Sequence, residues 1–291
     1  MPTFQTIGLI GRQRKEDITD TLHALRDLLK KRNLNIVIET ETATFFPKER
    51  IPTYPRDQLG KHCDLIIVVG GDGSLLNAAR AGVDAQTPVL GINRGRLGFL
   101  TDINPNEIQT KVATVLDGYF TEEKRFMLDA HIADKNKNIY VDIALNDVVL
   151  MPGEAAHMIE FSITIDEQFV CSHRADGMII ATPTGSTAYA LSGGGPILHP
   201  SLNAVVLVPM FPHTLSARPI VISADSVIKI TIPETNETSP YLSCDGQSRV
   251  EVPLGATIVI NKKPQYLRLI HPQDYNYFET LRSKLHWNTK L

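Results

Sequence analysis

The sequence predicts an α/β domain followed by a mostly β domain, and three observations support this fold class. Up to about residue 120, short apolar runs alternate with stretches of helical periodicity. From about Tyr119 onward, period-two strands and turns dominate. The apolar run from Leu65 to Val69 ends in glycines and leads into a helix-like stretch, which is typical of a buried parallel strand.

The first domain is expected over residues 1–120 and begins with a strand–helix–strand pattern. One helix is expected from Ile18 to near Asn33 and another after Asn104, because apolar residues recur there at helical spacing. The proline-rich loop 46–55 is expected to be irregular and exposed. The strand–helix–strand pattern at the start of the chain predicts a parallel, Rossmann-like sheet with right-handed crossovers. The strand-like segments are 6–11, 35–39, 64–69 and 88–92.

The second domain is expected over residues 121–270. Dense strands with few helical stretches predict sheets packed face to face, which is an all-β sandwich. Asp166-Glu167 is a predicted hairpin turn. The last stretch, 271–291, is polar with scattered aromatic residues and is expected to be a separate terminal segment. The strand-like runs of this domain are 125–133, 139–150, 158–165, 169–172, 205–208, 219–222, 227–232 and 256–260.

Composition excludes several classes of protein. The 291 residues are 43% hydrophobic and 21% charged, as expected for a globular protein of about two domains. A net charge of −3 gives no positive field to attract nucleic acid or an anionic membrane. No apolar run approaches the ~20 residues of a membrane span, and no signal-peptide pattern is visible, so the cytoplasm is the expected location. The three cysteines are scattered and contain no C-x-x-C pair, so neither a disulfide framework nor a zinc site is expected.

The stretch from Gly70 to Ser74 follows the apolar strand and is the first candidate ligand site. Open α/β sheets bind ligands at the carboxyl ends of their strands, where a helix N-terminus favours phosphate. Gly70, Gly71 and Gly73 are expected to take positive φ and to let a ligand approach the backbone closely. Asp72 puts a negative charge where an anion would bind, so we expect it to accept a proton from a hydroxyl or to hold a metal that the phosphates carry. A tight turn with a solvated Asp is the alternative, since short glycine motifs are weak signals.

Two further segments are candidates for ligand contact. Segment 91–102 places three glycines around Arg94 and Arg96 at the same sheet edge, although a plain strand-to-helix connection with solvated arginines is the alternative. Asn146-Asp147 interrupts an apolar strand, so one of the two side chains should point inward. A buried carboxamide or carboxylate needs partners, which a diol such as ribose would supply. A bulge or an edge position is the alternative.

The segment from Asp176 to Tyr189 is rich in Gly, Ser and Thr and contains one aromatic residue. Hydroxyl and backbone N–H groups suit ribose and phosphate oxygens, and Tyr189 is suited to stack on a base or a nicotinamide ring. A turn-rich connection with hydroxyl caps is the alternative. The chain contains no G-x-x-x-x-G-K-[ST] and no G-x-G-x-x-G after its first strand, so neither a P-loop nor a standard dinucleotide fingerprint is present.

In this order, these segments resemble the NAD kinase family, and 209–219 resembles its proteobacterial branch. The G-G-D-G element is shared with diacylglycerol-type lipid kinases and phosphofructokinases, whereas T-P-T-G-S-T-A-Y in the right order behind it is specific. The resemblance covers nearly the whole chain, to Asp245-Gly246-Gln247 and beyond. It implies phosphoryl transfer from ATP, or in some members from polyphosphate, to the 2′-hydroxyl of the adenosine ribose of NAD. The product is NADP, so the enzyme would set the NAD/NADP balance.

The resemblance also implies roles for individual residues. Asp72 matches the family's catalytic aspartate, which accepts the proton of that hydroxyl, and Gly73 lies against the same ribose. In relatives the last segment, here 271–291, returns to the first domain. Some NAD contacts cross a subunit boundary, because the family forms homodimers or homotetramers. The other matched NAD-contact positions are Asn146, Asp147, His157, Arg174, Asp176, Thr184, Gly185, Ser186, Thr187, Ala188, Tyr189 and Gln247.

The donor phosphates and the metal are less defined by the sequence. Some relatives carry a basic residue where this chain has Asn77, so it stays open which residue supplies positive charge to the donor phosphates, and Arg94 and Arg96 are the candidates. No dedicated protein metal site is visible, so Mg²⁺ is expected to arrive with the phosphates.

Two other functions remain open at this point. A lipid kinase of the diacylglycerol kinase type would need an apolar acceptor pocket and a membrane-facing surface, and no basic amphipathic helix is visible. A non-catalytic redox sensor that binds NAD(H) or NADP(H) would not need Asp72. The hydroxyl-rich segment suits a dinucleotide better than a lipid, so the expected partners are NAD and ATP or polyphosphate, with no nucleic acid and no membrane.

Overall fold

The computed structural model describes residues 3–11, 18–93, 98–134, 137–153 and 157–287. The chain divides into two compact units, Met1–Lys124 with Gln265–Leu291 (unit 1) and Arg125–Pro264 (unit 2). Two long strands, β6 (Phe120–Asp134) and β17 (Thr257–Pro272), contain the unit boundaries, so each contributes residues to both units. The last stretch of the chain therefore belongs to the same unit as the first strands.

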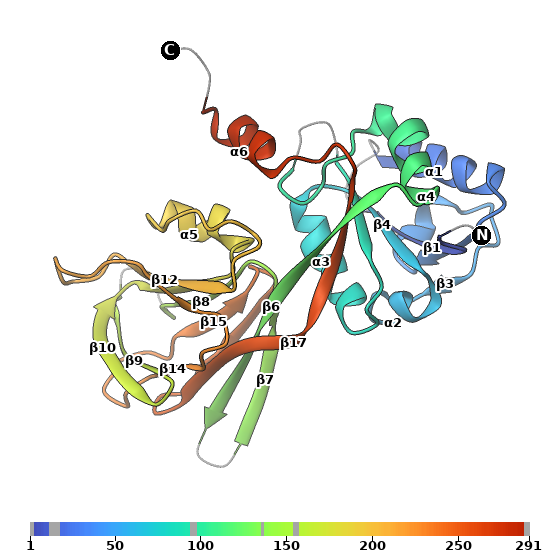
Figure 1. Ribbon diagram of the computed structural model, residues 1–291. Coiled ribbons are helices and arrows are strands. Elements are labelled where there is room, and N and C mark those ends of the chain that lie inside the picture. The colour runs from blue at the N-terminus through green and yellow to red at the C-terminus, as the bar shows by residue number, and fades with distance from the viewer. Residues whose placement is uncertain (1–2, 12–17, 94–97, 135–136, 154–156, 288–291) are drawn as a thin grey trace. The chain divides into compact units, whose positions relative to one another are not determined.

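Unit 1 is built around a parallel sheet (Figure 1). Its strand order is β5–β4–β1–β2–β3, and the end of β17 pairs in parallel with the free side of β5. All five residues of the central strand β4 are buried, as expected for a parallel strand that is covered on both faces. The bounds are β1 (Thr6–Gly11), β2 (Asn35–Glu39), β3 (Thr53–Tyr54), β4 (Leu65–Val69) and β5 (Val89–Ile92).

Helices cover both faces of this sheet (Figure 1). One face packs on α1 and the segment 108–116, with which Ile7, Leu9 and Ile67 share one hydrophobic cluster. On the other face, the backbone of Gly8 in β1 lies close to Leu59 at the end of α2. The helices of unit 1 are α1 (Thr19–Lys31), α2 (Arg56–Leu59), α3 (Asp72–Val83), α4 (Ala113–Leu116) and α6 (Tyr277–Leu285), with a π-helical turn at Ile108–Val112 and 3₁₀ turns at Thr42–Phe45, Gly60–His62 and Pro105–Glu107.

Unit 2 consists of two antiparallel sheets. In one, the order is β10–β9–β14–β17, and β6 pairs with both β17 and β7; in the other it is β13–β12–β11–β8–β15–β16. The second sheet packs one face on α5, where Ala190 contacts a cluster that includes Ile179, Val206 and Val208. The bounds are β7 (Lys137–Ala144), β8 (Asp147–Met151), β9 (Ile159–Ile165), β10 (Gln168–Ala175), β11 (Gly177–Ala181), α5 (Tyr189–Ser192), β12 (Ala204–Met210), β13 (Ile220–Ser223), β14 (Ile228–Thr231), β15 (Tyr241–Cys244) and β16 (Ser248–Glu251), with a 3₁₀ turn at Gly185–Thr187.

The predicted fold class, an α/β unit and a mostly β unit, is confirmed, as is the hairpin turn at Asp166-Glu167, where both residues have positive φ. Other details differ from the sequence-based expectation. The strand expected over 139–150 is two strands, β7 and β8, separated at Leu145-Asn146. The loop 46–55 is irregular over most of its length and outside the buried core, as expected, except that it contains β3 and one buried residue, Phe46. None of the helices in the described part of the chain is both long and apolar enough to span a membrane.

Gly60 provides a test of the packing in unit 1. A Cβ added there would collide with the carbonyl oxygen of Ala81 in α3 and lie 3.0 Å from the Cβ of Ala85. We expect Gly60→Ala to destabilise the protein by about 1–3 kcal/mol and to lower its Tm by several degrees. The matched control is Gly73→Ala in α3, whose Cβ would meet no atom within 4 Å and whose Tm should stay equal or rise. Equal Tm values for the two variants would contradict this packing.

Candidate functional site

Asp72 is the first residue of α3, and its carboxylate is held by the loop that follows β5. The N–H groups of Phe99 and Leu100 donate to the two carboxylate oxygens at 2.9 and 3.0 Å, and the Thr101 hydroxyl lies 3.3 Å from Oδ1. The N-terminus of a helix is also where the helix dipole favours a negative charge. Asp72 is only half-buried, so its carboxylate combines a fixed orientation with access from solvent.

The glycines near Asp72 do not have the backbone conformation that the sequence predicted. Gly70, Gly71 and Gly73 are not among the residues with positive φ, so that prediction was wrong. A Cβ at Gly71 or Gly73 would meet nothing within 4 Å, which leaves open space beside this turn. The steric requirement lies instead at Gly98, where a Cβ would collide with Oδ1 of Asp72.

The residues expected to hold the donor phosphates are only partly described. The amide nitrogen of Asn77 donates to the carbonyl of Gly73 at 3.2 Å, so this side chain binds its own helix. Arg94 and Arg96 lie outside the described residues.

In unit 2, the carboxylate of Asp245 organises the backbone around Asn146 and Asp147. It accepts the N–H groups of Leu145, Asn146 and Asp147 at 2.9, 2.7 and 3.2 Å. Asp245 and Gly246 have positive φ in the turn between β15 and β16, which aims the carboxylate at this backbone. The donors on three consecutive residues are thereby used outside the sheet, which explains the break between β7 and β8.

The segment 182–189 packs on the same backbone. The N–H of Thr182 donates to the carbonyl of Asn146 at 2.9 Å, and the Thr182 hydroxyl donates to the carbonyl of Leu145 at 2.5 Å. A Cβ at Gly185 would collide with the Asn146 carbonyl, so this close approach requires glycine. The structure therefore brings together Asn146, Asp147 and the predicted residues 184–189. We call the group formed by 145–147, 182–189 and Asp245 the Asp245 cluster.

The hydroxyl groups of this segment bind the protein itself. The buried Thr184 hydroxyl accepts from the guanidinium of Arg125 at 3.1 Å. The fully buried Ser186 hydroxyl donates to the Pro183 carbonyl at 2.6 Å and accepts from the N–H of Leu198 at 2.9 Å. Thr187 donates to the carbonyl of Thr184 at 3.1 Å. These bonds fix the shape of the segment, which leaves the half-exposed Tyr189 ring as its most accessible group.

Asp147 is a titratable group of this cluster whose pKa is shifted strongly by its surroundings. Its side chain is buried, and burial raises its pKa from the ordinary 3.8 to about 7, with the negative charge of Asp245 adding to the effect. Near neutral pH a substantial fraction of Asp147 is therefore a neutral acid, which can donate a hydrogen bond as well as accept one.

His157 and Arg174 line a separate cavity of unit 2, with a volume of about 300 Å³. The cavity is largely polar: Glu160 lies opposite Arg174 in the β9–β10 ladder, and His157 Nδ1 lies 3.8 Å from the carboxylate of Glu237. None of the residues of the Asp245 cluster lines it. The structure thus pairs two of the predicted NAD contacts with each other rather than with the cluster.

The remaining predicted contacts lie in turns of unit 2. The N–H of Asp176, just after β10, donates to the carbonyl of Met210 at 2.9 Å. Gln247 is exposed in the same turn as Asp245, and its N–H donates to the carbonyl of Cys244 at 2.9 Å.

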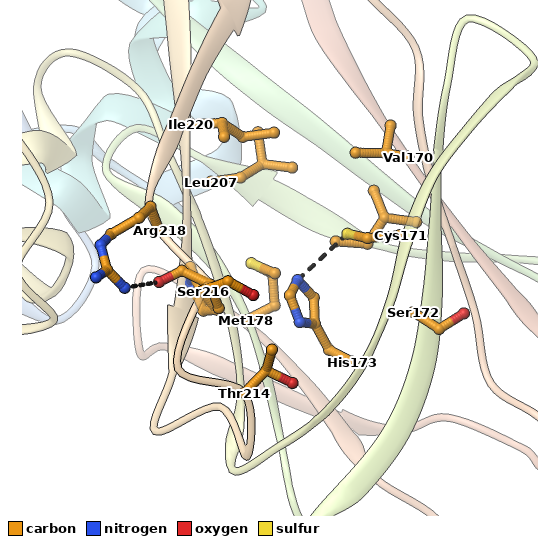
Figure 2. Close-up of a pocket in the computed structure, with 13 residues that line it drawn as sticks. Val170, Cys171, Ser172, His173, Met178, Leu207, Thr214, Ser216, Arg218 and Ile220 are labelled. Atoms are coloured by element: carbon orange, nitrogen blue, oxygen red, sulfur yellow. Dashed lines mark hydrogen bonds between the residues drawn. The ribbon is translucent and has the colours of Figure 1, made fainter.

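Another cavity, of about 260 Å³, lies against β9–β10 on one side and β11–β13 on the other (Figure 2). None of the predicted site residues lines it. Its Cys171 thiol lies 3.3 Å from Nε2 of His173, but burial raises the pKa of the thiol and lowers that of the imidazole. Both groups are therefore neutral near pH 7, so the pair is not an activated nucleophile.

Sequence reasoning missed three parts of the site: Asp245, Arg125 and the backbone donors of 98–101. Two of them leave a signal in the sequence. Arg125 is a charge at the start of an apolar run, and Asp245-Gly246 follows a strand as a turn pair.

In the described part of the chain, no three or more His, Cys, Asp or Glu side chains form a group that could hold a metal.

Comparison with known families matches almost the whole chain. The sequence profile of the ATP-NAD kinase N-terminal domain matches residues 7–120, and that of the ATP-NAD kinase C-terminal domain matches residues 145–272. A curated NAD kinase from Coxiella burnetii (strain Dugway 5J108-111) is 56% identical over 289 residues, which are 99% of this chain and 96% of the relative. A curated NAD kinase from Chromohalobacter salexigens is 54% identical over 291 residues, covering 100% of this chain and 99% of the relative.

Two solved structures share the fold. Yeast NADH kinase complexed with NADH superposes with a TM-score of 0.90 at 25% identity, covering 99% of this chain and 89% of that chain. An NAD kinase from Archaeoglobus fulgidus in complex with ATP has a TM-score of 0.75 at 24% identity, covering 96% of this chain and 99% of that one.

The pKa of Asp147 leads to a prediction about stability. Between about pH 4 and 7 the unfolded chain has lost this proton while the folded protein retains it, so the stability of the native protein falls as pH rises through this range. Asp147→Asn removes the titration. Its Tm should exceed the wild-type Tm most clearly at pH 8, and the difference should shrink toward pH 4. In free energy of unfolding, each unit by which the pKa of Asp147 is raised corresponds to about 1.4 kcal/mol. Thermal unfolding at both pH values measures this difference.

The matched control is Glu251→Gln, which removes an exposed carboxyl in the same sheet and should show no such pH dependence. A difference in Tm between Asp147→Asn and wild type that is the same at pH 4 and pH 8 would mean that Asp147 titrates normally.

Proposed function

The chain belongs to the NAD kinase family, and we propose that it transfers a phosphoryl group from ATP to the 2′-hydroxyl of the adenosine ribose of NAD, with Asp72 as the general base. The reaction gives NADP and ADP and is that of a phosphotransferase with an alcohol acceptor. The observation that carries the proposal is the Asp72 carboxylate, which is held by three donors and is reachable from solvent.

The proposed chemistry needs little from the protein beyond position and charge. Phosphoryl transfer has a loose transition state, so catalysis depends mostly on alignment and electrostatic stabilisation. As the ribose oxygen bonds to the phosphorus, its O–H proton passes to Asp72 and the bond to the ADP oxygen breaks. General-base assistance of this kind is worth ~10²–10⁴-fold. The donors from 98–101 support this role because they hold the carboxylate in one orientation while Asp72 stays only half-buried.

The Asp245 cluster is the proposed site for the adenosine part of NAD. The cluster offers Asn146, the partly neutral Asp147 and the exposed ring of Tyr189. A carboxylic acid that both donates and accepts suits a purine edge, which presents an amino group beside a ring nitrogen. An exposed aromatic ring provides a surface for stacking. His157, Arg174, Asp176 and Gln247 are proposed to contact NAD as well, in a homodimer or homotetramer whose size light scattering can measure.

Kinases that use ATP generally need a divalent metal, and we propose Mg²⁺. The described residues offer no protein-held metal group, whereas the space beside Gly71 and Gly73 at the N-terminus of α3 is open. That combination fits a metal carried in by the donor phosphates rather than one bound by side chains. When bound, it would neutralise phosphate charge. A cytoplasmic location is proposed from the sequence composition.

A direct assay tests the proposal. The purified protein is incubated with ATP, Mg²⁺ and NAD, and NADP is measured with an NADP-specific dehydrogenase. Separate incubations replace ATP by polyphosphate and NAD by NADH, because the yeast neighbour was solved with NADH. Formation of NADP supports the proposal. The absence of NADP with either donor would remove it and would favour a non-catalytic dinucleotide-binding role.

Asp72→Asn tests the general base. We expect kcat to fall by ~10²-fold or more while NAD still binds, because the proposed adenosine site lies on other residues. Steady-state kinetics and NAD titration measure the two effects. Asp84→Asn makes the same chemical change just beyond the other end of α3, at an exposed residue, and should leave kcat unchanged. If Asp72→Asn kept normal turnover, the assignment of Asp72 as the base would be wrong.

A further inference from the structure

The position of the Asp72 carboxylate is set by a loop rather than by its own helix. We call Gly98–Asp102 the Asp72 loop. Two backbone N–H groups and one hydroxyl of this loop bind the carboxylate. The loop closes on itself through the N–H of Gly98, which donates to the carbonyl of Thr101 at 2.9 Å. Any shift of the loop would therefore shift the carboxylate with it.

The C-terminal end of this loop is anchored to buried structure. Asn93 N–H donates to the carbonyl of Ile103 at 2.9 Å, which joins the chain just after the loop to the chain just after β5. The carboxylate of Asp102 lies 2.8 Å from Nδ1 of His271, in β17. The His271 side chain is fully buried and that of Asp102 is 7% exposed, so this contact is shielded from water.

His271 is itself fixed from two further directions. Its Nε2 lies 3.4 Å from the carboxylate of Glu123 in β6, and its ring stacks on Tyr275 with centroids 3.8 Å apart. Burial alone would lower the pKa of His271, but the hydrogen bond to Asp102 and the negative charges of Asp102 and Glu123 outweigh it and raise the pKa. Such an imidazole makes a strong, charge-assisted contact with Asp102. The Asp72 loop also contacts α6, since the amino group of Lys284 lies 5.9 Å from the centre of the Phe99 ring.

We infer that His271 is a positioning residue for the reaction: through Asp102 it holds the Asp72 loop, and through the loop it fixes the carboxylate of Asp72. The inference rests on the proposed role of Asp72. His271 reaches Asp72 only through Asp102 and the loop, so it acts on the orientation of the base and not on the substrate. The strand that returns from unit 2 thereby takes part in the chemistry of unit 1.

Two substitutions of His271 separate positioning from packing. His271→Phe keeps an aromatic ring for stacking on Tyr275 but removes the donor to Asp102. His271→Asn places an amide nitrogen near the position of Nδ1 and can restore that donor. We expect kcat to fall about 10- to 100-fold in His271→Phe, since misplacement of about 1 Å can cost ~10²-fold. The KM for NAD should stay within about twofold, and His271→Asn should recover most of kcat.

The matched control is Arg268→Gln in the same strand. Arg268 binds the carboxylate of Glu122 in β6 at 2.7 and 2.8 Å and the carbonyl of Gln86 at 3.2 Å, and neither of these partners belongs to the Asp72 loop. This variant also weakens the link between β17 and β6, so its Tm should fall while its kcat stays normal. A general loss of structure would instead lower kcat in both Arg268→Gln and His271→Phe.

Combination with Asp72→Asn completes the test. If His271 acts through Asp72, adding His271→Phe to Asp72→Asn should lower kcat no further. Normal kcat in His271→Phe, equal losses in His271→Phe and His271→Asn, or a full additional loss in the double variant would each overturn the inference. A wild-type protein that makes no NADP, or a fully active Asp72→Asn variant, would instead overturn the proposed function.

Discussion

Three consecutive backbone N–H groups converge on the carboxylate of Asp245, and the arrangement of the candidate dinucleotide site in unit 2 depends on this contact. Hydrogen bonds to a charged group contribute about 1.5–3 kcal/mol each. Without the carboxylate, these donors would be left beside the buried Asp147. The contact holds Leu145 and Asn146 out of the strand ladder, and their carbonyls accept from the hydroxyl and the N–H of Thr182. The segment 182–189 can then pack on them through Gly185.

Unit 1 uses the same type of contact for a different purpose. Asp72 also accepts two backbone N–H groups and interacts with a third donor, the Thr101 hydroxyl. The two aspartates differ in what surrounds them. Asp245 binds the backbone between β7 and β8 and orders that segment of chain, whereas Asp72 has open space beside Gly71 and Gly73. The first carboxylate is therefore structural, and the second has both the fixed orientation and the access that a general base needs.

The sequence predicts the parallel sheet of unit 1 well, because continuous apolar runs such as 65–69 identify buried strands without knowledge of their neighbours. It does not predict the break at Leu145-Asn146, since the cause is a carboxylate about 100 residues away. The same limit applies to the glycines. Gly70, Gly71 and Gly73 stand out in the sequence, but the crowded positions are Gly98 and Gly185, whose need for glycine arises from Asp72 and Asn146.

The Asp147–Asp245 pair shows how the structure accommodates two acidic groups near each other. Three N–H groups are directed at the carboxylate of Asp245, whereas Asp147 is buried, and burial together with the negative charge of Asp245 raises the pKa of Asp147. Asp147 responds by holding its proton to about pH 7. The carboxylate that shapes the backbone thus also adds to the effect of burial on the protonation of its neighbour. Asp245 therefore holds the backbone that carries the Asp147 side chain, and it reinforces the burial that lets this side chain keep a proton and donate a hydrogen bond.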